Sequence, residues 1–332
     1  MEQANAIELK NITKRFGEVV ANDSVDLSVK HGEILSVLGE NGSGKTTLMN
    51  MISGIYFPDE GQIFVDGEEV SICSPKDSFA LGIGMIHQHF KLVDVLTAAE
   101  NIILGLEGKS VLDMKKVVQD IQEVTERYGF ELDPNQKIYD MSVSQKQTVE
   151  IVKMLYRGAN ILILDEPTAV LTPQETEKLF TVLRNMRDQG KSIIIITHKL
   201  NEVLALSDRV SVLRKGKYIG TVETKNATAE SLTEMMVGEK IDLNIERPDP
   251  VNPVKRLVIE NLSCVNKEGV KTLKNASMEA YGGEILGIAG IAGSGQKELC
   301  ETIAGLMKVK KGAILYKKEN IIGKSPEEII KI

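Results

Sequence analysis

The segment GEILSVLGENGSGKTTLMN, residues 32–50, predicts the fold of the N-terminal part of the chain. Its short aliphatic run Ile34–Leu38 has the composition of a buried strand, and Gly39–Thr46 matches the pattern GxxxxGK[ST]. Such glycines let backbone N–H groups turn inward around a phosphate, and the start of the following helix adds partial positive charge. An ordinary glycine-rich turn is the alternative, but the flanking strand and helix favour a phosphate-binding loop.

This loop predicts the residues that contact a phosphorylated ligand. Lys45 is expected to reach the β- and γ-phosphates, and the hydroxyl of Thr46 is expected to bind Mg²⁺. The other expected contacts are their neighbours along the loop, namely Gly39, Glu40, Asn41, Gly42, Ser43, Gly44 and Thr47.

Two further aliphatic runs end in residues that carry chemistry. Ile161–Leu164 leads into Asp165 and Glu166, which places two carboxylates at the end of a strand where ligands bind in open α/β sheets. Asp165 is expected to hold Mg²⁺, and Glu166 to polarise the water that attacks the γ-phosphate. His198 follows the run Ile193–Thr197, and it either contacts the γ-phosphate or is a partly exposed structural histidine.

Three other positions each permit two interpretations. Gln88, in the string GIGMIHQHF, either touches Mg²⁺ or the attacking water, or is a surface residue. Phe16 either stacks on an adenine or lies in the core. Ser142 precedes a helix predicted at about residues 146–157, where it binds a phosphate together with backbone amides or only caps the helix.

The periodicity and the turn residues indicate an α/β fold. A helix is predicted to start at Pro173 behind a capping box formed by Thr172 and Glu175, and to stop at Gly190. Residues 117–124 have the apolar spacing of another helix, and Val210–Val222 is expected to form a hairpin. Strands alternating with helices favour a mainly parallel sheet.

The C-terminal part of the chain repeats its beginning. GEILGIAGIAGSGQKELCETIAG at residues 283–305 echoes residues 32–54 with an offset of 251 (283 − 32). The repeat breaks off at Ile332, the counterpart of Leu81. We therefore expect a first domain over residues 1–240, a linker over 241–254, and an incomplete second copy over 255–332.

The order of these features resembles the ATP-binding cassette (ABC) ATPases. The resemblance implies ATP and Mg²⁺ as ligands. The P-loop NTPase fold that it implies has a parallel core sheet flanked by helices, an antiparallel β-subdomain and a helical subdomain. It also implies that Phe16 stacks on adenine, that Gln88 forms the Q-loop, and that His198 is the switch histidine. The signature segment that it implies contains Ser142, Ser144 and Gln145.

Two departures from the common ABC pattern point to a subfamily. The signature is MSVSQ where the family usually has LSGGQ, so that Ser144 replaces a glycine, and the string TAVLTP has Thr172 where many members have Asp. Both variants resemble the two-cassette subfamily that drives the import of simple sugars and nucleosides. The string HQHFKL around Gln88 is closer to the nucleoside type than to the sugar type, which commonly shows an HQEL-like string.

The second loop keeps its glycines but loses the phosphate-binding cation. Gln296 stands at the place of Lys45, and Glu298 adds a carboxylate close to where a phosphate would lie. We expect this second site to bind Mg-ATP poorly, because one charge-assisted contact is lost and repulsion is added. ABC cassettes pair head to tail, with each ATP between one P-loop and the other signature. The chain is therefore expected to be a fragment of a two-cassette protein that hydrolyses ATP slowly unless a second cassette, in cis or in trans, supplies a signature.

Composition and charge exclude several classes of function. The net charge of −7 argues against a dedicated nucleic-acid binder, which should be basic. The sequence shows no 18-residue apolar run and no signal-peptide pattern at MEQANAIELK, and its three cysteines have no CxxC spacing. We expect a peripheral protein on the cytoplasmic face of the cell membrane, without a zinc site or a disulfide framework.

The favoured function is therefore the ATPase subunit of an importer. Its expected partners are transmembrane permease subunits and, indirectly, an extracytoplasmic solute-binding protein. Residues 89–95 (HFKLVDV) either dock the permease or pack inside. The alternatives are a soluble ABC ATPase that acts on ribosomes or nucleic acid, and a non-catalytic nucleotide sensor.

Overall fold

The computed structural model describes residues 5–88, 90–106, 113–239, 253–265, 271–290 and 293–332. The chain divides into two compact units, residues 1–242 and 243–332. Most of the linker predicted over residues 241–254 lies outside the described residues. Each unit has its own apolar core and is described by itself.

The central sheet of the first unit has six strands in the order β10-β9-β3-β8-β7-β6. All run parallel except β10, which pairs antiparallel with β9. Every residue of β3, β7 and β8 is buried, so the continuous aliphatic runs reflect burial on both faces and the prediction of a parallel core is confirmed. The strands are β3 (Ile34–Leu38), β6 (Ile83–Ile86), β7 (Ile161–Asp165), β8 (Ser192–Thr197), β9 (Arg209–Arg214) and β10 (Lys217–Glu223).

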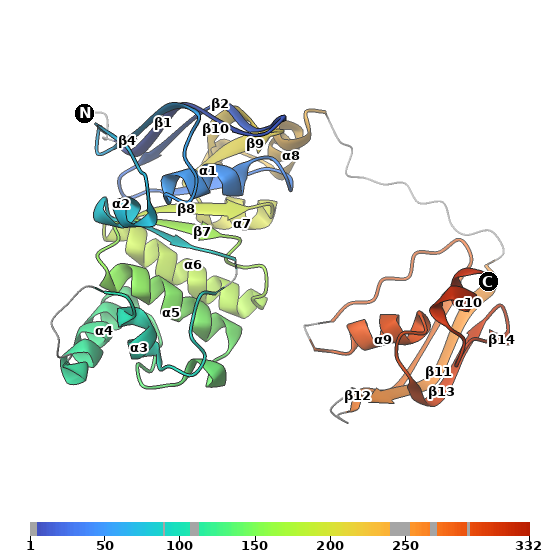
Figure 1. The fold of residues 1–332 in the computed structure, drawn as a ribbon. Helices are drawn as coiled ribbons and strands as arrows, with labels where there is room; N and C mark the ends of the chain where they lie inside the picture. The colour runs from blue at the N-terminus through green and yellow to red at the C-terminus, as the bar shows by residue number, and fades with distance from the viewer. Residues whose placement is uncertain (1–4, 89, 107–112, 240–252, 266–270, 291–292) are drawn as a thin grey trace. The chain divides into compact units, whose positions relative to one another are not determined.

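An antiparallel sheet in the order β2-β1-β4-β5 forms a second layer. Helix α1 (Lys45–Ile52) lies between this sheet and the central one (Figure 1). Leu48 of α1 belongs to one apolar cluster with Ile7 of β1 and Ile194 of β8, so the helix is fixed from both sides. The strands of this sheet are β1 (Asn5–Phe16), β2 (Val19–Lys30), β4 (Glu60–Val65) and β5 (Glu68–Val70).

Helices α5 and α6 cover the opposite face of the central sheet, and α3 and α4 pack beyond them (Figure 1). The helical cluster joins Ile102, Ile121 and Val149 of α3, α4 and α5. Every helix among the described residues is too short or too polar to cross a lipid bilayer. The remaining elements are α2 (Pro75–Ala80), α3 (Ala98–Ile103), α4 (Met114–Tyr128), η1 (Ile138–Asp140), α5 (Val143–Tyr156), α6 (Pro173–Asp188), α7 (Leu200–Leu206), η2 (Thr224–Asn226) and α8 (Ala229–Val237).

The predicted element boundaries are confirmed with one exception. Helix α6 begins at Pro173 with the predicted capping box, and the β9–β10 hairpin turns at Lys215-Gly216. The predicted start of α5 near residue 146 is wrong, because the helix begins at Val143. The reason is a second capping box: the Ser142 hydroxyl accepts the N–H of Gln145, whose side chain accepts the N–H of Ser142.

The second unit repeats the antiparallel layer of the first, in the order β12-β11-β13-β14. Helix α9 stands at the counterpart of α1, and the glycines before the two helices, Gly44 and Gly295, have φ angles of 95° and 93°. The elements of this unit are β11 (Lys255–Val265), β12 (Lys271–Tyr281), α9 (Gln296–Ile303), β13 (Val309–Tyr316), β14 (Glu319–Asn320) and α10 (Pro326–Ile330).

One expected counterpart does not form a strand. Residues 284–290, which correspond to β3 in sequence, have no regular structure, and Ile285 is 82% exposed. In the first unit β3 pairs with β8 and β9 on its two sides. In the described part of the second unit, no strand pairs with this segment, and a strand needs such a neighbour to satisfy its backbone hydrogen bonds.

Candidate nucleotide-binding site

The phosphate-binding loop wraps around the side chain of its own lysine. Lys45 is the first residue of α1, and its Nζ donates to the carbonyl oxygens of Gly39 at 2.7 Å and Glu40 at 2.9 Å. An ammonium group has three N–H donors, so one remains for a ligand. Burial lowers the pKa of Lys45, while nearby carboxylates, Glu166 foremost, act in the opposite direction.

Backbone carbonyl oxygens of neighbouring strands lie close to two glycines of this loop. A Cβ on Gly39 would lie 2.3 Å from the carbonyl oxygen of Leu213 in β9. A Cβ on Gly44 would lie 2.4 Å from the carbonyl oxygen of Ala21 in β2. The loop therefore requires glycine at both positions, and its shape is held by the strands on either side.

The loop contains one buried polar atom that the protein leaves unpaired. The hydroxyl of Ser43 is buried and has no hydrogen-bond partner, although buried hydroxyls nearly always find one. Together with the free N–H of Lys45 and the glycine cradle, it fits a ligand that carries several oxygen acceptors, as a triphosphate does.

Two hard oxygen ligands meet beside the loop. The hydroxyl of Thr46 donates to Oδ2 of Asp165 at 3.4 Å. Burial and the neighbouring Glu166 raise the pKa of Asp165, and the bond from Thr46 lowers it. Among the described residues no three His, Cys, Asp or Glu side chains gather to hold a metal ion. The pair fits Mg²⁺, which commonly takes one or two protein ligands and completes its shell with phosphates and water.

Glu166 follows Asp165 at the carboxyl edge of the central sheet. Its φ of 47° is rare for a residue with a side chain, and its N–H donates to the carbonyl oxygen of Ile196 at 2.9 Å. Nδ1 of His198 lies 2.9 Å from Glu166 Oε1, and Gln88 Nε2 donates to Oε2 at 3.5 Å. Gln88, Asp165 and Glu166 line a cavity of about 90 Å³. The structure therefore brings these predicted residues together around one carboxylate.

The remaining predicted residues make contacts of other kinds. Phe16 is 44% exposed at the end of β1 and meets the ring of Tyr56 edge-on at 5.2 Å, so the alternative that it lies in the core is wrong. The signature residues at the start of α5 bond to one another and to Glu175. Among the described residues, no hydrogen bond joins them to residues 39–47.

The segment proposed for docking shows both expected features. His89 lies outside the described residues. Leu92 packs against the helical cluster, whereas Val93 and Val95 are 39% and 68% exposed.

Sequence reasoning missed the residues that tie the segments around Glu166 and His198 to one another. Nζ of Lys199, next to His198, donates to the carbonyl oxygen of Thr168 at 3.0 Å and to Glu202 at 2.9 Å. Gln147 of α5 donates to the carbonyl oxygen of Pro167 at 2.8 Å. These contacts join segments that are distant in sequence, and no local pattern signals them.

Comparison with known proteins decides the family. Residues 22–169 match the ABC transporter family. The chain is 47% identical to the nucleoside import ATP-binding protein NupA of Lactococcus lactis subsp. cremoris, over 99% of this chain and 65% of the relative. The chain contains an ABC transporter ATP-binding domain. The chain is also 46% identical to the guanosine import ATP-binding protein NupO of Bacillus subtilis, of which it covers 64%. It is 40% identical to the ribose import ATP-binding protein RbsA of Clostridium tetani, of which it covers 65%.

The chain thus spans about 65% of the length of the curated relatives that it matches. A solved structure of the ABC cassette MJ1267 in its ADP conformation is similar to 71% of this chain and 99% of its own length, with a TM-score of 0.63 and 26% identity. CbiO1 of Clostridium perfringens, part of the complex cbiONQ, is similar with a TM-score of 0.61, 26% identity, and coverage of 71% and 95%. The ABC cassette fold predicted for the first unit is confirmed.

Proposed function

We propose that the first unit binds ATP with Mg²⁺ at residues 39–47 and hydrolyses it, and that this hydrolysis drives import of nucleosides or simple sugars. The observation that carries hydrolysis is the placement of Glu166. Its carboxylate lines the cavity beside Asp165, with His198 on one oxygen and Gln88 on the other.

The roles of the side chains follow from these contacts. Glu166 orients the attacking water and accepts its proton. His198 and Gln88 hold the two oxygens of that carboxylate in a fixed direction, so little reorganisation is needed when the water attacks. The remaining N–H of Lys45 binds the γ-phosphate as negative charge develops on it.

The metal has its own protein ligands in this proposal. Thr46 and Asp165 would hold Mg²⁺, with Gln88 beside them. Bound there, the ion would neutralise charge on the β- and γ-phosphates.

Glu166→Gln tests the catalytic part of the proposal. The amide cannot accept the proton of water, so we expect ATP hydrolysis to fall about 10²- to 10⁴-fold while ATP affinity is retained. Glu177→Gln, at an exposed position of α6, is the matched control and should leave both quantities unchanged. A chain that binds ATP but has no hydrolysis for Glu166→Gln to abolish would instead be a nucleotide sensor.

The signature needs a partner in this proposal. In ABC proteins each ATP lies between the P-loop of one cassette and the signature of the other. Ser142, Ser144 and Gln145 would therefore meet the triphosphate of a second cassette, in the same chain or in another. The degenerate loop around Gln296 would bind Mg-ATP poorly.

The names of the relatives support import. NupA and NupO are named for nucleoside and guanosine import, and RbsA for ribose import. The nucleoside names belong to the two relatives of higher identity, so we favour nucleosides. Permease subunits would form the membrane path, a solute-binding protein would deliver the solute, and the chain would lie on the cytoplasmic face of the membrane.

A hollow beside the Q-loop supports the docking of a permease segment. It holds about 260 Å³ and has an apolar wall that includes Phe79. Three cationic residues, Lys91, Lys153 and Arg157, line it together with one carboxylate, that of Glu150. Burial lowers the pKa of both Lys153 and Arg157, and Nε of Arg157 is buried without a hydrogen-bond partner. A cytoplasmic permease loop with an acidic side chain would complement these cations.

Capture of the membrane partner tests the import proposal. The tagged chain, cross-linked in membranes, should retain permease subunits, and uptake of labelled nucleosides should fall when the chain is depleted. Retention of ribosomes instead would favour the soluble ABC class, and loss of ribose uptake alone would favour the sugar type.

A further inference from the structure

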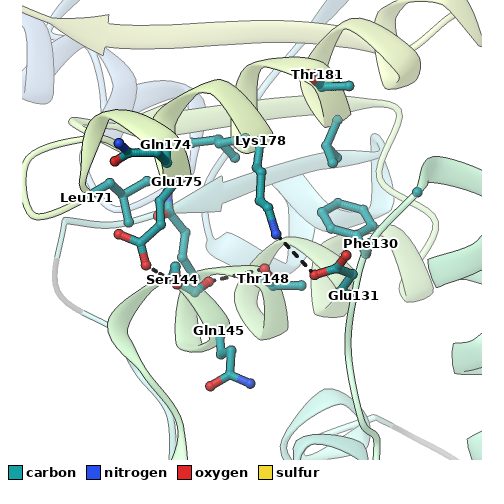
Figure 2. A pocket seen from close by; sticks show the side chains of 14 residues that line it. Phe130, Glu131, Ser144, Gln145, Thr148, Leu171, Gln174, Glu175, Lys178 and Thr181 are labelled. Atoms are coloured by element: carbon teal, nitrogen blue, oxygen red, sulfur yellow. Dashed lines mark hydrogen bonds and ion pairs between the residues drawn. The ribbon is translucent and has the colours of Figure 1, made fainter.

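Ser144 connects the signature segment to helix α6. The residue lies in the first turn of α5, and its side chain points across a cavity of about 540 Å³ toward α6 (Figure 2). Its hydroxyl donates to Oε1 of Glu175 at 2.6 Å. A glycine, the usual family residue at this position, has no group to make this contact.

The contact fixes where the hydroxyl protons lie. The other oxygen of Glu175 accepts the N–H and the hydroxyl of Thr172, both at 2.9 Å. These bonds, first that from Ser144, lower the pKa of Glu175, so its carboxylate is ionised near neutral pH and only accepts. The single proton of the Ser144 hydroxyl is therefore committed to Glu175.

The next hydroxyl along the segment must then be the donor. Oγ of Ser142 lies 3.0 Å from Oγ of Ser144, and because Ser144 has no proton left, Ser142 donates in this bond. Oγ of Ser142 also accepts the N–H of Gln145 at 3.3 Å. Ser142 thus presents an oxygen lone pair to its surroundings, while its proton points toward Ser144.

We propose that Ser144 and Glu175 are positioning residues that hold the Ser142 proton away from the triphosphate of the facing cassette and so weaken the grip of this signature. The inference rests on the proposed function, in which Ser142 meets that triphosphate. Phosphate oxygens accept hydrogen bonds and do not donate them, so Ser142 must break its bond to Ser144 before it can bind one.

The cost of breaking that bond sets the size of the effect. A neutral hydrogen bond is worth about 0.5–1.5 kcal/mol net, so freeing Ser142 should strengthen each signature contact about two- to 13-fold. A symmetric pair of chains contains two such contacts, so its dissociation constant should fall about five- to 150-fold.

ATP-dependent pairing of the full chain tests this without relying on hydrolysis. In a Glu166→Gln background, sedimentation with Mg-ATP should show tighter pairing for Ser144→Ala and for Ser144→Gly than for the parent. Thr181→Ala, on α6 and lining the same cavity, is the control and should pair like the parent, because its hydroxyl bonds only the carbonyl oxygen of Glu177. ATP affinity at low protein concentration should not change, because residues 39–47 are untouched.

A double variant separates positioning from simple repacking. With Ser142→Ala present, Ser144→Ala should give no further tightening, because the proton that it releases is gone. Unchanged or weaker pairing in Ser144→Ala and Ser144→Gly overturns the inference, and so does a gain that persists without the Ser142 hydroxyl. The proposed function fails by another result, namely a wild-type chain that binds Mg-ATP at residues 39–47 but hydrolyses none.

Discussion

At the scale of single residues, we predict that nucleotide affinity depends on Lys45. Its third N–H is the cationic donor of the loop, since the first two bind Gly39 and Glu40. Loss of one charge-assisted hydrogen bond costs about 1.5–3 kcal/mol, so Lys45→Ala should weaken ATP binding about 10- to 150-fold. Calorimetry with Mg-ATP measures this. Lys297→Ala, at an exposed lysine of the second loop, should leave the affinity unchanged, and equal losses in the two variants would contradict this assignment.

Asp165 gives a pH-dependent prediction at the same scale. Its pKa is raised, chiefly by burial, so it loses its proton at a lower pH in the unfolded chain than in the native protein. At neutral pH the native state therefore carries a charge that its surroundings disfavour. Asp165→Asn should raise the melting temperature at about pH 7, and the gain should vanish below about pH 4, where the carboxyl is protonated in both states. A gain independent of pH, seen by scanning calorimetry, would show that charge is not its cause.

Sequence patterns predicted the residues around the loop. They did not predict the contacts between helices that position the surrounding segments. Lys45 and Thr46 belong to one short pattern. Asp165 and Glu166 follow the run Ile161–Leu164, whose aliphatic composition predicts a buried strand. The bond from Ser144 to Glu175 spans 31 residues and depends on how α5 and α6 pack. Only the folded chain shows such a contact.

At the scale of elements, the turn from β3 into α1 depends on what surrounds its glycines. Gly42 and Gly44 have φ angles of 81° and 95°, but a Cβ would meet open space at Gly42 and the Ala21 carbonyl at Gly44. Alanine at either position should cost about 1–2 kcal/mol for the left-handed backbone. Gly44→Ala should cost more, because β2 or α1 must also shift. Urea denaturation measures both variants, and equal losses would mean that the contact with β2 does not restrain the turn.

Element boundaries were predicted well where the cap is visible in the sequence. The Thr172 capping box places the start of α6, and the same kind of box at Ser142 places the start of α5. The start predicted for α5 at about residue 146 is too late, because Gln145 is the partner of Ser142 in this capping box and already lies in the first turn of the helix. Capping residues and signature residues coincide here, so one pattern supports both interpretations.

At the scale of the whole molecule, the internal repeat can be recognised in the sequence because glycines that need a positive φ stand at equivalent positions in both copies. Gly61 and Gly312 have φ angles of 99° and 112°, and each would place a Cβ within 2.7 Å of the carbonyl oxygen of an asparagine, Asn11 or Asn261. The lack of regular secondary structure in residues 284–290 could not be predicted from the repeat. Whether an aliphatic run becomes a strand depends on the strands beside it, which a repeat pattern does not contain.

The division into two units predicts that the first is self-sufficient in binding. Among the described residues, its apolar clusters use only positions between 6 and 236, and the side-chain hydrogen bonds of Lys45, Asp165 and Glu166 lie within that range. A chain of residues 1–242 should therefore bind Mg-ATP with the same dissociation constant as the full chain, by calorimetry. It should also keep its melting temperature, since no core residue is removed. Weaker binding by the shorter chain would mean that residues 243–332 contribute directly to the site, and a lower melting temperature would mean that they stabilise the cassette from outside its core.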